Sequence, residues 1–244
     1  AKDLGGTELD HARGLVSWQG DLEAAYRSCL WSRYASRVFL TLVEFPAPNE
    51  DALYEGALKV DWGQHMDVDT TFAVDCSLHQ SAIHHSGFAA LRVKDAVVDQ
   101  FREACNERPN VSVVRPGIRI RASVYKDQAS ISLDLSGESL HRRGYRKEGG
   151  SLAPLKESLA AGIVALSGWT SETSPEIMFL DPMCGSGTIL IEAALIFGDA
   201  APGLSRSYFG FSGWKMHDKV LWNSLVDEAI EREEAGLKRK WPPM

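Results

Sequence analysis

The stretch most capable of chemistry begins where a short apolar run meets an acid and two glycines. It reads Ile-Met-Phe-Leu-Asp-Pro-Met-Cys-Gly-Ser-Gly-Thr over residues 177–188. An apolar strand that leads through an acid and a Gly-Ser-Gly turn into a helix is the turn at which doubly wound α/β sheets bind nucleotide-like ligands. The glycines let a ligand approach the backbone, and the helix N-terminus offers free N–H groups. The string therefore predicts a ligand-binding loop.

The residues after this turn distinguish three possible ligands. A phosphate-binding P-loop needs a lysine after its last glycine, but Gly187 is followed directly by Thr188. A dinucleotide site with the pattern GxGxxG needs a third glycine where this chain has Leu190. S-adenosylmethionine carries no phosphate, and its cationic amino-acid end can meet the carboxylate of Asp181. We expect S-adenosylmethionine as the cofactor, with an ordinary strand–helix turn capped by Asp181 as the alternative.

The elements that must position this loop alternate between strand and helix patterns. Spacing of apolar residues predicts strands over residues 13–20, 38–45, 70–76, 118–125, 129–135 and 177–180. It predicts helices over residues 21–37, 51–58, 87–103, 156–167, 188–197 and 218–240. Asp21 is the expected N-cap of the first helix. From about residue 137 the chain becomes polar, basic and Gly-rich, as domain linkers are. The fold class is therefore α/β.

Composition excludes several classes of protein. A chain of 244 residues, at roughly 150 residues per domain, should form one or two domains. It has no apolar run long enough to span a membrane and no signal-peptide pattern, so we expect a cytoplasmic protein. Its four cysteines form no CxxC pair, which argues against a zinc site or a disulfide scaffold, and we expect no metal. The chain starts with Ala, so we expect a fragment of a longer protein.

Charge is distributed unevenly along the chain. The net charge of −7 argues weakly against a nucleic-acid partner, but residues 108–126 and 139–147 contain basic residues and no acid. Local patches, not the total, set the affinity for phosphates. The second run combines cations with an aromatic that could stack on a base, which makes four residues candidates for RNA binding: Arg142, Arg143, Tyr145 and Arg146. A merely solvated surface remains the alternative.

Several strings carry a resemblance to a known family. DPMCGSGTILIEAA resembles motif I of the Rossmann-type methyltransferases that act on amino groups of nucleic-acid bases. Joined to the upstream strings LSGESLHRRGYR and APLKESLAAGI, it resembles the group of these enzymes with an N-terminal THUMP domain. The nearest similarity is to the bacterial 23S rRNA guanine-N2 methyltransferase family, whose members were often labelled N6-adenine-specific DNA methylases. The resemblance covers nearly the whole chain, including GDLEAAYRSCLWSRYASR, LRVKDAVVDQF and APGLSRSYFGFSGW.

This resemblance implies a domain order. Residues 1–20 would be the tail of a ferredoxin-like subdomain, 21–137 a THUMP RNA-binding domain and 138–153 a basic linker. Residues 154–244 would be the first part of a Rossmann-like, S-adenosylmethionine-dependent methyltransferase domain. A helix with Pro154, Lys156 and Glu157 would lie beside the cofactor loop as motif X. The cofactor loop itself would consist of Asp181, Pro182, Met183, Cys184, Gly185, Ser186, Gly187 and Thr188.

The implied activity is methylation of guanine N2 in 23S ribosomal RNA, in which Cys184 needs no role as a nucleophile. The family's catalytic Asn-Pro-Pro-Tyr motif is absent from these 244 residues, where Pro-Pro occurs only at 242–243 and without the Asn. The acid that grips the cofactor ribose in the family is absent too. Catalytic residues are therefore unassigned, and we expect residues 1–244 alone to be inactive. An RNA-binding module and a DNA adenine-N6 methyltransferase are the alternatives, and the THUMP-like half favours RNA.

Overall fold

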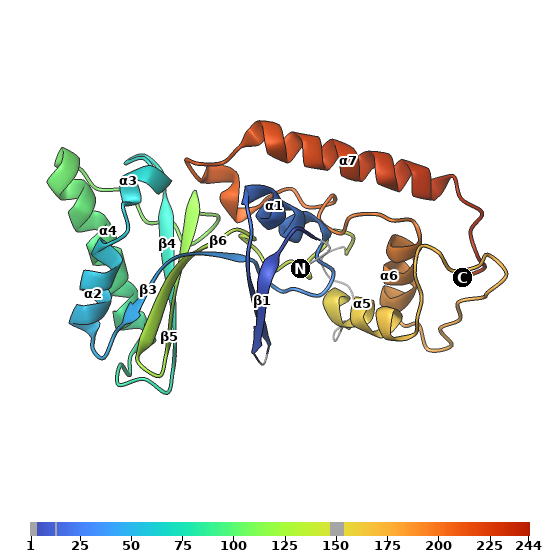
Figure 1. The fold of residues 1–244 in the computed structure, drawn as a ribbon, viewed down its shortest axis with the longest axis horizontal. Helices are drawn as coiled ribbons and strands as arrows, with labels where there is room; N and C mark the ends of the chain where they lie inside the picture. Colours follow the sequence, from blue (N-terminus) through green and yellow to red (C-terminus); the bar gives the residue numbers. More distant parts are fainter. Residues whose placement is uncertain (1–3, 13, 147–153) are drawn as a thin grey trace. The chain divides into compact units, whose positions relative to one another are not determined.

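The computed structural model describes residues 4–12, 14–146 and 154–244, and they form two compact units (Figure 1). The first unit comprises residues 1–37, 139–207 and 218–244, and the second comprises residues 38–138 and 208–217. The chain thus leaves the first unit, builds most of the second, and returns. Both units contain helices and strands, which confirms the predicted α/β class.

A four-stranded sheet forms the centre of the second unit, with the order β3-β6-β5-β4. Its strands are β3 (Phe39–Pro46), β4 (Phe72–His79), β5 (Ile118–Tyr125) and β6 (Gln128–Asp134). β4 runs parallel to β5 and the other pairs are antiparallel. A parallel pair needs a long crossover, and α4 (Ser86–Cys105) lies in it. The short helix α3 (Trp62–His65) follows α2 (Glu50–Leu58).

The two faces of this sheet differ in polarity. Along β5 every second side chain, from Ile118 to Val124, is buried, whereas Arg119, Arg121, Ser123 and Tyr125 are partly or fully exposed. This alternation is the period of a strand with one face in the core and one outside. Helices α2 and α4 cover the apolar face (Figure 1). The predicted strand pair over 118–125 and 129–135 is confirmed, the second strand lying one residue earlier.

The first unit begins with a hairpin of β1 (Thr7–Ala12) and β2 (Leu15–Gln19), followed by α1 (Leu22–Trp31). The strand predicted over 13–20 corresponds to β2, whereas β1 was not predicted. Gly14, with φ of +78°, adopts the left-handed conformation that the reversal needs. Helix α1 is shorter than predicted, and Asp21 caps it by accepting the N–H of Ala24 at 2.8 Å, as expected.

Three further helices complete the first unit: α5 (Glu157–Leu166), α6 (Thr188–Phe197) and α7 (Lys219–Leu237). α5 and α6 pack around Val164, Trp169, Ala193 and Phe197. All three agree closely with the predicted ranges. None of the described helices is both long enough and apolar enough to cross a membrane.

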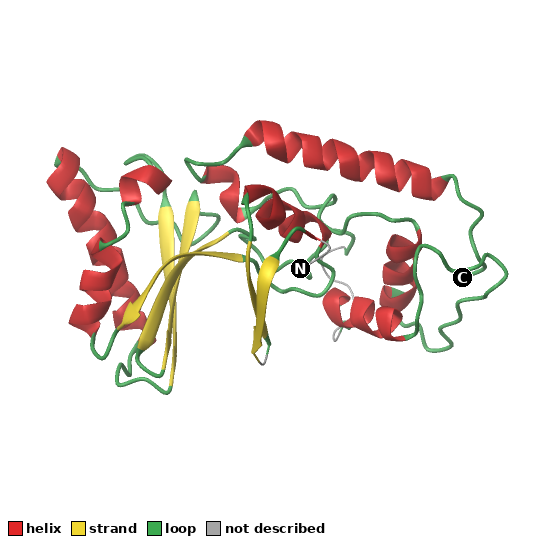
Figure 2. Cartoon of the chain, viewed as in Figure 1, coloured by secondary structure: helices red, strands yellow, loops and turns green. Residues whose placement is uncertain are grey.

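The predicted strand over residues 177–180 is wrong, because these residues form a loop (Figure 2). Phe179 packs edge-on against Trp169, and its N–H donates to the carbonyl of Pro243 at 3.0 Å. Met178 and Leu180 are 64% and 74% exposed. A strand needs a neighbouring strand to satisfy its backbone N–H and C=O groups. In the part of the chain that the structure describes, no strand lies beside residues 177–180.

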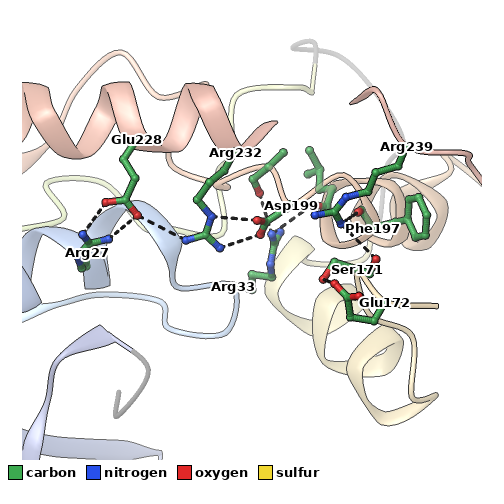
Figure 3. Close-up of polar contacts among 11 residues, drawn as sticks. Arg27, Arg33, Ser171, Glu172, Phe197, Asp199, Glu228, Arg232 and Arg239 are labelled. Carbon is green, nitrogen blue, oxygen red and sulfur yellow. Dashed lines mark hydrogen bonds and ion pairs between the residues drawn. The ribbon is translucent and has the colours of Figure 1, made fainter. Parts of the chain in front are cut away.

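Helix α7 is attached to α1 and to the end of α6 by ion pairs (Figure 3). The carboxylate of Glu228 accepts hydrogen bonds from both terminal nitrogens of Arg27 in α1, at 3.0 and 2.6 Å. Arg232 donates to both carboxylate oxygens of Asp199, which follows α6, at 2.9 Å each. Bidentate guanidinium–carboxylate pairs fix orientation as well as distance. The charged helix predicted from the sequence, α7, therefore connects α1 to the end of α6.

A glycine contact at the C-terminal end of α7 gives a test of this packing. A Cβ added at Gly236 would overlap the carbonyl oxygen of Gly198. Although alanine favours a helix over glycine by about 1 kcal/mol, we expect Gly236→Ala to lower the free energy of unfolding by about 1–3 kcal/mol. Urea unfolding followed by circular dichroism measures the change.

Gly162 provides the matched control, because it also lies in a helix but an added Cβ there meets no heavy atom within 4 Å. Gly162→Ala should leave stability unchanged or raise it by up to about 1 kcal/mol. A Gly236→Ala protein as stable as the Gly162→Ala protein would show that α7 does not contact the end of α6 in this way.

Candidate functional site

The Gly-rich loop closes into one turn that leads directly into α6. Gly185 and Gly187 have φ of +52° and +74°, the left-handed region that glycine adopts without a steric penalty. The N–H of Gly187 donates to the carbonyl of Cys184 at 2.8 Å, which closes the turn. A Cβ built at either glycine meets no heavy atom within 4 Å. The backbone of the turn is therefore bare, and a ligand can approach it directly.

The side chains around this turn supply polar groups at both ends. At the start, one carboxylate oxygen of Asp181 accepts the N–H of Met183 at 3.0 Å. At the end, the buried hydroxyl of Thr188 lies 3.1 Å from that of Ser186. The residues between them, from Pro182 to Ser186, are exposed. The first N–H groups of a helix have no partner within it and attract oxygen atoms of a ligand.

These features fit the expected cofactor. All eight predicted residues, from Asp181 to Thr188, lie in one continuous turn. The turn offers a carboxylate for a cationic group, an uncovered backbone for a flat ring and a helix N-terminus for carboxylate or hydroxyl oxygens. It contains no lysine or arginine that would mark a phosphate site. The donor set suits S-adenosylmethionine better than a nucleotide phosphate.

The basic run before α5 is built differently from the prediction. The guanidinium of Arg143 is buried, and its Nε donates to Oε1 of Glu192 on α6 at 2.9 Å. Its Nη2 donates to the carbonyl of Arg33 at 2.7 Å. The hydroxyl of Tyr145 donates to the same Glu192 oxygen at 3.0 Å, and burial raises the pKa of this phenol, which keeps it protonated. The charge of Arg143, one of the predicted RNA-binding residues, is thus buried and already paired in the structure.

Arg146 connects the starts of two helices. Its Nε pairs with Glu157, the first residue of α5, at 2.9 Å. Its Nη2 donates to Oγ1 of Thr188, the first residue of α6, at 2.8 Å, and also to the carbonyl of Leu155. Glu157 belongs to the stretch that the resemblance placed beside the cofactor loop. Arg146 therefore links the start of α5, at Glu157, to the start of α6, at Thr188, where the Gly-rich loop ends.

Of the four candidate RNA-binding residues, Arg142 is the one whose side chain is exposed. The segment 139–146, part of the predicted basic linker, belongs to the first unit, while residues 147–153 lie outside the described residues. Sequence reasoning missed Glu192 as the partner of this segment. One signal was available, since Glu192 and Thr188 are the polar residues of an otherwise apolar helix.

Arg33 extends this buried network toward the C-terminal end of α6. Its Nη2 donates to the carbonyls of Leu195 and Ala200, at 3.2 and 2.7 Å. Burial lowers its pKa to about 10, which leaves the guanidinium charged at neutral pH. The carbonyl of Arg33 also accepts a hydrogen bond from Nη2 of Arg143. Arginines outside α6 therefore hold this helix from its first turn to its last.

The described residues contain no group of three or more His, Cys, Asp or Glu side chains placed to hold a metal ion. All four cysteines are free thiols in the structure, and Cys184 is exposed in the Gly-rich loop.

Three family models match the chain in succession. They are the RlmL ferredoxin-like domain over residues 1–39, the THUMP domain over residues 47–134 and the RMKL-like methyltransferase domain over residues 143–241. The third match contains the Gly-rich loop, Arg146 and Glu192. The Gly-rich loop therefore lies in a region similar to known methyltransferases.

Relatives with similar sequences share one name, ribosomal RNA large subunit methyltransferase K/L. The protein from Desulfotalea psychrophila is 54% identical over 99% of this chain and 33% of its own length. The protein from Syntrophotalea carbinolica is 54% identical over 97% of this chain, again with 33% of its own length covered. The chain spans about one third of the length of these relatives.

Solved structures agree with the sequence comparisons. A predicted N6-adenine-specific DNA methylase from Listeria monocytogenes superposes with a TM-score of 0.78 and 34% identity, covering 89% of this chain and 56% of that one. The protein SMU.472, solved in complex with SAH, gives a TM-score of 0.79 and 33% identity, covering 92% of this chain and 58% of that one. Sequence, domain order and fold support one assignment. With its THUMP domain and its RMKL-like methyltransferase region, the chain belongs to the family of the ribosomal RNA large subunit methyltransferases K/L.

Proposed function

We propose that this chain supplies the RNA-holding and cofactor-binding parts of an S-adenosylmethionine-dependent methyltransferase that acts on guanine N2 in 23S ribosomal RNA. The observation that carries the proposal is the bare Gly185–Gly187 turn at the start of α6, inside the region similar to RMKL-like methyltransferases. The complex of SMU.472 with SAH supports the choice of cofactor, since SAH is S-adenosylmethionine without its methyl group. A ribosomal RNA substrate implies a cytoplasmic location.

The residues of the turn have distinct parts in this proposal. When bound, S-adenosylmethionine supplies a methyl group on a cationic sulfur, which an amine of the substrate can attack. Gly185 and Gly187 leave room for the cofactor against the backbone. Asp181 offers a carboxylate to the cationic amino-acid end. Arg146 binds Thr188 and Arg143 binds Glu192, so in this proposal the two arginines hold α6 in place.

RNA and DNA are the two candidate substrates. The Listeria structure is described as a predicted N6-adenine-specific DNA methylase, whereas the relatives similar over nearly the whole chain are named for ribosomal RNA. The THUMP domain match favours RNA. An exocyclic amine must be unstacked before it can reach a methyl group, and single-stranded loops of RNA expose such bases without cost.

Methyl transfer by the full-length protein that carries this chain tests the proposal. We expect radiolabel from methyl-labelled S-adenosylmethionine in unmodified 23S RNA, recovered after nuclease digestion as N2-methylguanosine, and none in duplex DNA. Label recovered from DNA as N6-methyladenine would replace the proposal with the second candidate.

Cofactor binding can be tested apart from activity. We expect Asp181→Ala to weaken the binding of SAH at least tenfold in calorimetry, because a hydrogen bond to a charged group contributes about 1.5–3 kcal/mol. Met183→Ala is the control, since the Met183 side chain is 89% exposed in the same loop and should change affinity little. Both variants should unfold cooperatively like the unmodified chain. An unchanged affinity of Asp181→Ala would contradict the assignment.

The basic segment separates RNA contact from stability. Arg142→Ala should weaken RNA binding and reduce the slope of log affinity against log salt by about one unit, the value of one lost phosphate contact. Arg143→Ala should instead lower the free energy of unfolding by about 3–5 kcal/mol, because it leaves the buried Glu192 without its cation. Salt titrations and urea unfolding measure the two effects. A changed slope without lost stability for Arg143→Ala would reverse these roles.

A further inference from the structure

The hydroxyl of Thr188 lies where the Gly-rich turn enters α6, and it is buried, at 4% exposure of the residue. Nη2 of Arg146 lies 2.8 Å from this hydroxyl oxygen, and the hydroxyl oxygen of Ser186 lies 3.1 Å from it. Among the residues that the structure describes, the Thr188 side chain makes no other hydrogen bond. The three side chains therefore form one series of contacts that leads from Arg146 into the turn.

Arg146 is held in place on the side away from Thr188. Its Nε pairs at 2.9 Å with the carboxylate of Glu157, which is almost fully buried. Its Nη2 also donates to the carbonyl of Leu155. Because a guanidinium is planar and its donors form a rigid fork, these contacts fix the direction in which Nη2 faces. Arg146 therefore presents this nitrogen to Thr188 independently of any ligand.

The direction of each hydrogen bond in the series follows from chemistry and burial. A guanidinium has N–H donors and no acceptor, so the Thr188 oxygen accepts from Arg146. A buried hydroxyl hydrogen without an acceptor costs free energy. In the described part of the chain, the oxygen of Ser186 is the acceptor within reach of the Thr188 hydrogen. Thr188 therefore donates to Ser186, and not the reverse.

This direction determines what Ser186 can offer to a ligand. Ser186 lies in the exposed part of the turn. Since its oxygen accepts from Thr188, its own hydrogen is left for a group outside the turn. A series of hydrogen bonds that starts at a cation strengthens each donor that follows. The turn thus offers a hydrogen-bond donor at Ser186 and an acceptor, the Asp181 carboxylate, at its other end.

We propose that Arg146 is a positioning residue of the Gly-rich turn: through Thr188 it orients the hydroxyl of Ser186 to donate a hydrogen bond to an acceptor oxygen of the ligand. The inference rests on the proposed function for its ligand, S-adenosylmethionine, which carries such oxygens on its carboxylate and on its ribose. If Arg146 only tied α5 to α6, its removal would affect the fold and the affinity for the ligand independently of Ser186.

Calorimetry with SAH on the full-length protein that carries this chain tests the series. Ser186→Ala, Thr188→Val and Arg146→Gln should each weaken SAH binding about fivefold, as expected for one lost hydrogen bond. Because the three groups act in series, adding Arg146→Gln to Ser186→Ala should change the affinity less than twofold further. Thr188→Ser keeps the hydroxyl and should restore most of the affinity that Thr188→Val loses.

Arg239→Gln is the matched control, because Arg239 also donates to α6 but at its opposite end, to the carbonyl of Phe197 at 3.3 Å. This variant should lower the stability in urea and change SAH affinity less than twofold. Urea unfolding followed by circular dichroism checks that every variant is folded.

The ligand 5′-methylthioadenosine distinguishes the two acceptors, because it has the ribose of SAH and no carboxylate. A loss of affinity in Ser186→Ala for SAH alone would assign the acceptor to the carboxylate. An equal loss for both ligands would assign it to the ribose. Either result supports the hydrogen bond from Ser186.

Unchanged SAH affinity in Ser186→Ala would overturn the inference. A further fivefold loss on adding Arg146→Gln to Ser186→Ala would also overturn it, because Arg146 would then act without Ser186. In both cases, weakened binding by Asp181→Ala would leave the proposed function standing. An unmodified protein that binds no SAH would overturn the inference together with the cofactor assignment.

Discussion

The ion pair between Arg143 and Glu192 is the constraint on which the first unit depends. Both side chains are almost fully buried, at 2% and 0% exposure. A carboxylate inside a protein is costly unless it is paired and hydrogen-bonded. Glu192 meets that condition through its Oε1, which accepts hydrogen bonds from both Arg143 and Tyr145, whereas its buried Oε2 has no hydrogen-bond partner among the described residues. Helix α6 can therefore bury this face only where the segment 143–145 lies against it.

The position of the candidate cofactor turn follows from this constraint. The turn is the entry to α6, so whatever holds the helix also holds the turn. Arg146 fixes the first residue of the helix through Thr188, and Gly198 at the other end packs against Gly236 of α7. The exposed loop itself makes few contacts of its own. The geometry of the loop is therefore set by the residues that hold α6, and its exposed side remains available to a ligand.

The second unit uses a different principle. The period of strand β5 directs apolar side chains into the core, on the face that α2 and α4 cover, and polar side chains to the other face. A sheet with antiparallel strands needs only one face in the core to be stable, so its other face can carry polar side chains. Arg119, Arg121 and Tyr125 occupy that surface without loss to the core, because their neighbours in sequence point to the opposite side.

The sequence by itself determined the fold class, the Gly-rich turn, most helices and the β5–β6 hairpin. These features depend on local patterns, such as the alternation along Ile118–Tyr125 and the conformational freedom of Gly185 and Gly187. Only the tertiary structure decided which charges face solvent. Arg142 and Arg143 are neighbours with the same side chain, yet one is exposed and the other buried. The difference arises because Glu192, 49 residues away, lies within reach of one of them. The loop over residues 177–180 was decided in the same way, since an apolar run forms a strand only where another strand lies beside it to receive its hydrogen bonds.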